Sequence, residues 1–238
     1  MIKEALQYLV SLKDNKTYEI NGHTYSDTNL CRIDPPRYYP ESIAVNGLDS
    51  ICKLVREEIE AVGKKVYIQA SSHNIVDVFT TYDDQYKRAY LYRCRADVPP
   101  VTTGRFMPYE NAVIELRSLY IPNDDISYLL NLLSSISSES KIVSNDNGVT
   151  QQVEAKKGIA LSSMVTVKQR VELKPFRTFL EVNQPESEFI LRIDDDGRIG
   201  FFEADGGVWK LEAKKNIAAY FEAELQDLIE EDKVVVIR

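Results

Sequence analysis

Apolar residues recur at helical spacing in about five parts of the chain. The clearest stripe has an apolar residue every three or four positions and ends at Gly63, where a glycine suits a helix end: Leu48, Ile51, Cys52, Val55, Ile59 and Val62. The same spacing predicts helices over residues 2–13, after Pro108, after Asn123 or Asp124, and from Ile217 to Ile229. We therefore expect about five helices.

Between these helices apolar and polar residues alternate, which is typical of half-buried strands. Asn21-Gly22 separates two short β-prone segments, and this dipeptide favours a hairpin turn. Three successive strands are expected within residues 65–94, and the segment MVTVKQRVELKP predicts one long strand. After Gly206-Gly207, the segment VWKLEA is expected to pair back as a strand, and KVVVI closes the chain as another.

This order of elements predicts an α+β fold with mixed, mostly antiparallel sheets, arranged as two α+β halves. Residues 1–100 are expected to form an N-terminal α+β unit. Residues 101–140 are interpreted as a helical connector. Residues 141–238 then form a C-terminal β-meander that ends in a helix and a strand.

Composition places the chain among ordinary globular proteins, with 238 residues, 44% hydrophobic and 28% charged. Tyrosine is unusually frequent, with 14 copies against one tryptophan, and we expect most of these rings on half-buried strands. A net charge of −8 disfavours non-specific binding to nucleic acid. One local basic patch is a candidate exception: Lys87, Arg88, Arg93 and Arg95.

The three cysteines, Cys31, Cys52 and Cys94, are odd in number and widely spaced. This pattern predicts reduced thiols in a cytosolic protein and neither a disulfide framework nor a zinc site. The N-terminal segment lacks the uninterrupted apolar core of a signal peptide, and no apolar run reaches the roughly 20 residues of a membrane span. We expect a cytoplasmic protein with no membrane partner.

Motifs of catalysis and cofactor binding are missing from the sequence. Asp194-Asp195-Asp196-Gly197 lies between strand-like segments, so a hairpin turn explains it better than a calcium loop. Neither a Walker loop nor GxGxxG occurs, and His23 and His73 are too few for most histidine-based sites. No catalytic residue, metal or cofactor is predicted. Carboxylate pairs remain an open alternative, because 37 acidic residues produce some pairs by chance.

Two arginine–aromatic segments and one polar glycine cluster are candidates for ligand binding. Arginine can bind a phosphate or carboxylate in a bidentate manner, while a neighbouring ring stacks on a base. In each case an arginine paired with a structural carboxylate, or a tight turn with a buried aromatic anchor, is the alternative. The candidate residues are Arg37, Tyr38, Tyr39, Arg177, Glu203, Asp205 and Trp209.

The segments PFRTFLEVNQPESEFILR and FFEADGGVWKLEA, followed by the terminal helix and VVVI, resemble the C-terminal half of an uncharacterised phage and prophage family called YfdQ-like. The residues that carry the resemblance are Arg177, Thr178, Phe179, Glu181, Val182, Gln184 and Pro185, with Pro36-Arg37 as a weaker echo. The resemblance implies a viral or prophage origin and expression in a bacterial cytoplasm. It implies no catalytic residues.

We therefore expect a non-enzymatic binding protein encoded by a phage or prophage. It would bind or sequester a host protein or a small nucleotide-like anion, as an anti-defence protein does. The alternative is an accessory protein of phage DNA replication or recombination that binds single-stranded DNA or a recombinase, which needs basic and aromatic residues on one face. An enzyme with an unfamiliar carboxylate or tyrosine site is a third possibility. Potential edge strands favour a homo-oligomer.

Overall fold

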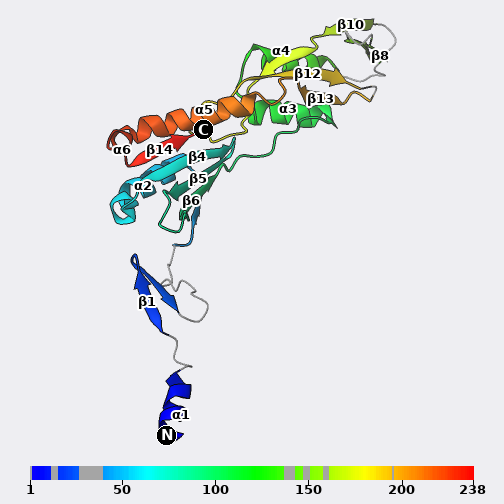
Figure 1. Ribbon diagram of the computed structural model, residues 1–238. Helices are drawn as coiled ribbons and strands as arrows, with labels where there is room; N and C mark the ends of the chain where they lie inside the picture. Colours follow the sequence, from blue (N-terminus) through cyan, green and yellow to red (C-terminus); the bar gives the residue numbers. More distant parts are fainter. Residues whose placement is uncertain are drawn as a thin grey trace. The chain divides into compact units, whose positions relative to one another are not determined.

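The computed structural model divides the chain into two compact units, Met1–Pro40 and Glu41–Arg238. The first unit contains helix α1 (Ile2–Ser11) and a hairpin of β1 (Thr17–Ile20) and β2 (His23–Ser26) (Figure 1). Asn21 and Gly22 have φ angles of 53° and 76°, so the predicted hairpin turn is confirmed. The structure describes residues 2–11, 16–26, 40–136, 143–146, 151–157, 161–194 and 196–238.

The predicted α+β class is confirmed, with six helices and four sheets within these residues. Three of the sheets are antiparallel and the largest, with five strands in the order β14-β4-β5-β6-β3, is mixed. Its strands are β3 (Ile43–Val45), β4 (Val66–Ser72), β5 (Ile75–Thr80), β6 (Tyr90–Arg95) and β14 (Val234–Ile237). The C-terminal strand pairs in parallel with β4, so residues of the expected first and third segments share one sheet.

Helices α2 (Leu48–Val62) and α5 (Trp209–Glu224) pack on the same face of this sheet. Alternate residues of β4, namely Val66, Ile68 and Ala70, lie in one core cluster with residues of both helices. Burying these apolar side chains is the main force that holds the helices on the sheet. The opposite face of the sheet carries the remaining residues of each strand.

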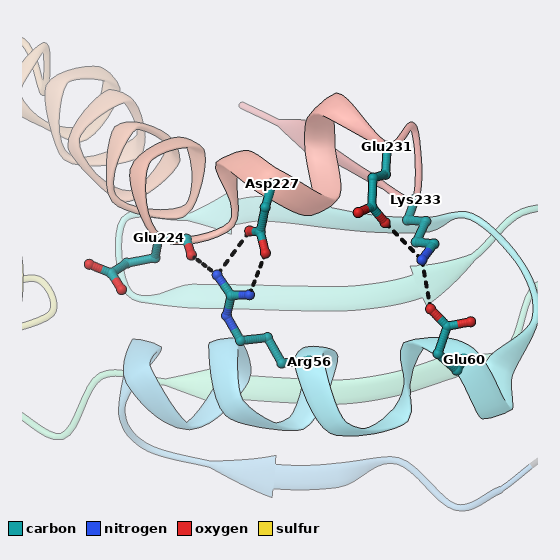
Figure 2. A network of polar contacts seen from close by, with 6 residues as sticks. All are labelled: Arg56, Glu60, Glu224, Asp227, Glu231 and Lys233. Carbon is teal, nitrogen blue, oxygen red and sulfur yellow. Dashed lines mark hydrogen bonds and ion pairs between the residues drawn. The ribbon is translucent and has the colours of Figure 1, made fainter.

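Ion pairs and hydrogen bonds join α2 to the C-terminal helix α6 (Gln226–Glu230) (Figure 2). Both terminal nitrogens of Arg56 donate to the Asp227 carboxylate, at 2.7 and 2.9 Å. Arg56 also donates to the Glu224 carbonyl at 2.5 Å, which satisfies an acceptor at the end of α5. Lys233 contacts Glu60 at 2.6 Å, so α2 and the chain end are joined at two points.

A second core lies between a four-stranded sheet and two helices, α3 (Tyr109–Ser118) and α4 (Asp124–Ile136). The sheet order is β11-β12-β13-β7, with all strands antiparallel. Asn123 and Asp125 cover its edge, because Asn123 donates to the Glu172 carbonyl at 2.7 Å and Asp125 accepts from the Glu172 amide at 2.7 Å. The strands are β7 (Phe106–Met107), β11 (Arg170–Leu173), β12 (Ser187–Ile193) and β13 (Ile199–Glu203).

Two strand predictions were wrong. The expected long strand MVTVKQRVELKP is divided between β10 (Leu161–Val167), in a sheet with β8 (Val143–Asp146) and β9 (Gln151–Lys157), and β11 in the second core. The expected strand VWKLEA forms the start of helix α5. The Asp205 carboxylate accepts from the backbone amides of Gly207 and Trp209, at 2.9 and 3.2 Å, and these bonds begin the helix.

No helix in the described part of the chain is both long enough and apolar enough to span a membrane.

Candidate functional site

Residues 174–186 form a loop between β11 and β12 that joins the two cores. Gln184, 6% exposed, lies at its centre. Its Oε1 accepts from the backbone amides of Arg177 and Thr178, at 3.1 and 3.2 Å. Its Nε2 donates to the carbonyls of Phe179 and Val182, at 2.9 and 3.3 Å. One side-chain amide therefore supplies the hydrogen bonds that a regular element would provide.

Other residues of this loop attach it to the first core. Phe179 is buried in the cluster formed by α2, α5 and the five-stranded sheet. The Thr178 hydroxyl donates to the His73 carbonyl in the turn between β4 and β5. The Glu181 carboxylate accepts from the Leu48 amide at 2.8 Å and so caps α2, whose preceding Gly47 provides no side chain. These residues have structural roles in the loop.

Arg177, Glu203 and Trp209, three of the predicted ligand-binding residues, lie together beside this loop. The guanidinium carbon of Arg177 lies 3.6 Å from the centre of the Trp209 ring. Arg177 donates to Glu203 at 3.0 Å and to the Ser187 hydroxyl, and its side chain is only 10% exposed. Burial lowers the pKa of Arg177 to about 10, so it remains charged at neutral pH. The arginine thus binds protein groups on two sides.

A hollow of about 370 Å³ opens next to Trp209 and has an acidic lining. Repulsion from these carboxylates opposes an anionic ligand at this position. Asp205 is also predicted as a ligand-binding residue, and its carboxylate caps α5. The acidic residues of the lining are Glu172, Glu186, Glu188, Asp205 and Glu212.

The other predicted ligand-binding residues, Arg37, Tyr38 and Tyr39, lie outside the described residues. Ligand binding by the candidate residues stays a prediction.

His73 contacts the Trp209 ring edge-on, with the ring centres 4.8 Å apart. Burial lowers the pKa of His73, and the nearby Lys210 and Arg177 lower it further. The imidazole is therefore neutral at pH 7. The ring packs against Trp209 from the turn between β4 and β5.

The face of the five-stranded sheet opposite α2 and α5 presents two rows of side chains. The first row is apolar and aromatic: Val235, Tyr67, Phe79 and Tyr90. The second row is mainly polar: Ile237, Gln69, Asp77, Arg93 and Ala44. Within it the Asp77 carboxylate accepts from Arg93 at 2.8 Å and from the Ser71 hydroxyl at 2.5 Å.

Arg88 lies against the rings of the aromatic row. Its guanidinium carbon lies 5.1 Å from the ring centres of Tyr67 and Phe79 and 3.9 Å from that of Tyr82. It also donates to the Thr80 carbonyl at 3.0 Å, which fixes its position above the rings. Tyr67 stacks on Phe79 at 5.7 Å. The result is a connected group of rings around one cation.

Three tyrosines at this end of the sheet are largely exposed. Tyr82 is 58%, Tyr90 56% and Tyr86 84% exposed, and the rings of Tyr82 and Tyr86 are 6.3 Å apart. We call the six residues Tyr67, Phe79, Tyr82, Tyr86, Arg88 and Tyr90 the tyrosine–arginine face. The basic residues of this segment were predicted from the sequence as a local patch, but its tyrosines were not predicted as a surface. Four tyrosines within residues 82–92, next to that basic run, were the available signal.

The described residues contain no group of three or more histidine, cysteine or acidic side chains that could hold a metal ion. Asp194 accepts from the Arg198 amide and side chain, both at 2.8 Å, as expected for a hairpin turn. Burial raises the pKa of Cys52 and Cys94 to about 12, which keeps both thiols protonated.

No protein-family model, curated protein or solved structure matches this chain.

Proposed function

We propose that this chain is a non-enzymatic protein that binds a partner through the tyrosine–arginine face. Its origin in a phage or prophage, and its action in the bacterial cytoplasm, are part of the same proposal and depend on the resemblance of residues 175–213. Binding or sequestering a host factor is the biological role we assign to it. The observation that carries the proposal is the exposure of Tyr82, Tyr86 and Tyr90 next to an arginine that is fixed over a group of rings, one of them Tyr82.

Exposed aromatic rings are unfavourably solvated, so burying them against a partner favours binding. Burying one large aromatic side chain on a partner contributes about 2 kcal/mol. Tyrosine and arginine are also the residue types most often found among the few that dominate binding energy. Because Arg88 is held by the Thr80 carbonyl and by three rings, little conformational freedom is lost on binding.

A nucleotide-like ligand at Arg177 and Trp209 has less support. These two groups stack on each other, and Arg177 already binds Glu203 and Ser187. A ligand there would need to displace these contacts and enter the acidic hollow.

Site-specific photo-cross-linking tests the proposal in the cells that naturally produce the protein. The photoreactive residue p-benzoylphenylalanine replaces Tyr86, and a control replaces Ile114 on α3, which is 63% exposed. We expect a discrete adduct from position 86 and none from position 114. The proposal is wrong if position 86 gives no adduct, or if both positions give the same adducts.

A further inference from the structure

We infer that the partner of the tyrosine–arginine face is single-stranded nucleic acid. This inference rests on the proposed function and names the chemical class of its partner. Two features carry it: the local charge of the segment that forms the face, and the geometry of its rings.

The segment that builds β4, β5 and β6 is basic in an otherwise acidic protein. Residues 64–95 contain six lysines and arginines and three aspartates, whereas the whole chain has 29 basic and 37 acidic residues. Basic residues next to a binding surface attract a phosphate backbone at short range even in an acidic protein, because charges farther than about 10 Å are screened by salt. The total charge therefore does not decide binding at this face.

Two of the three aspartates accept hydrogen bonds from neighbouring groups of the protein. Asp77 binds Arg93 and Ser71. Asp83 accepts from the backbone amides of Gln85 and Lys87, at 2.8 and 2.9 Å, and so closes the turn between β5 and β6. The side chains of Lys64 and Lys87 are exposed at the end of the sheet where β5 turns into β6, whereas Lys65 is paired with Asp232 and Arg93 with Asp77.

The rings provide surfaces on which bases can stack. Tyr82, Tyr86 and Tyr90 are each more than half exposed; Tyr90 begins β6, and Tyr82 and Tyr86 lie in the turn between β5 and β6, with Tyr82 against Arg88. Aromatic side chains on an open sheet bind unstacked bases, and each stacked base contributes about 1–3 kcal/mol. In a duplex the faces of the bases are covered by their neighbours, so the rings cannot reach them. The geometry therefore favours a single strand.

Fluorescence anisotropy of the full chain with labelled 20-nucleotide dT and rU strands, and with a duplex of equal length, tests the inference. At 50 mM salt we expect saturable binding to at least one single strand, weaker binding to the duplex, and a marked loss at 200 mM salt. The two strands distinguish DNA from RNA as the natural partner.

Matched variants connect this binding to the face. Tyr86→Ala should weaken binding roughly tenfold, whereas Tyr86→Phe keeps the ring and should bind like the unmodified protein. Ile114→Ala removes an exposed apolar side chain from α3 and should change nothing. Tyr86 lies in a turn and is 84% exposed, so Tyr86→Ala should melt at an unchanged temperature.

Absence of saturable binding at 50 mM salt, equal affinity for the duplex, or full affinity of Tyr86→Ala would each overturn the inference. A protein adduct from position 86 without oligonucleotide binding would overturn the inference and leave the proposed function standing. If both oligonucleotide binding and the position-86 adduct are missing, both proposals fail.

Discussion

Replacing Gln184 by alanine should strongly destabilise the second unit through the loop between the two cores. The change removes four hydrogen bonds: the amides of Arg177 and Thr178 and the Val182 carbonyl lose this partner, and the Phe179 carbonyl keeps only a 3.4 Å bond from the Val182 amide. Thr178 and Phe179 are almost fully buried, so water cannot replace the bonds to them without opening the loop.

The magnitude follows from the number and burial of these bonds. The two bonds to Thr178 and Phe179 are buried and contribute about 1 kcal/mol each, and the cost of the orphaned groups adds to this. The bonds to Arg177 and Val182 are partly buried and contribute less. We expect a loss of about 3 kcal/mol, which lowers Tm by roughly 6–12 °C for a unit of this size.

Thermal unfolding followed by circular dichroism measures the effect. Gln184→Met keeps most of the volume and should lose nearly as much stability as Gln184→Ala, since the hydrogen bonds are the cause. Asn216→Ala is the control, because it removes one exposed 2.9 Å bond to the same loop at Asn183. Wild-type stability of Gln184→Met, or equal losses in Gln184→Ala and Asn216→Ala, would refute the reasoning.

Three further predictions concern buried groups. Ellman's reagent at pH 8 should leave Cys52 and Cys94 unmodified in the folded protein and should modify both in urea. A fast reaction of the native protein would contradict the raised pKa of these thiols. Because burial lowers the pKa of His73, stability should fall as pH drops below about 6.5, and His73→Gln should reduce this dependence more than His23→Gln in urea titrations at pH 7 and 5. Arg177→Ala should cost about 3 kcal/mol in urea unfolding, and a loss below about 1 kcal/mol would argue against its buried pairing.

The loop of residues 174–186 shows which features of a site can be predicted from the local sequence. Its residues stand out in the sequence, and in the structure they hold a loop without regular elements between two cores. Arg177 and the cluster of Glu203, Asp205 and Trp209 were separate ligand-binding candidates in the sequence, and the structure places Arg177 next to Glu203 and Trp209. The sequence could not show that they bind one another, because that depends on the packing of β12, β13 and α5.

The pattern of the sequence by itself determined the α+β class, the stripes of α2 and α4, and the hairpins at Asn21-Gly22 and Gly197. These features depend on neighbours within a few residues, whose spacing and turn preferences are readable directly. The start of α5 was predicted as a strand, because the residues after Gly207 alternate between apolar and polar. The hydrogen bonds of Asp205 that begin the helix are not visible in that pattern.

Only the tertiary structure decided which strands share a sheet and which sheet face stays open. The pairing of β14 with β4 joins residues more than 160 positions apart, and no local preference encodes it. Tyrosine suits both a buried strand and an exposed surface, so the alternation of β5 and β6 predicts two faces without saying which one the helices cover. Because α2 and α5 both pack on one side, the rings of Tyr67, Phe79 and Tyr90 lie on the other, next to the exposed Tyr82 and Tyr86 of the adjoining turn, and this is the surface for which we propose binding.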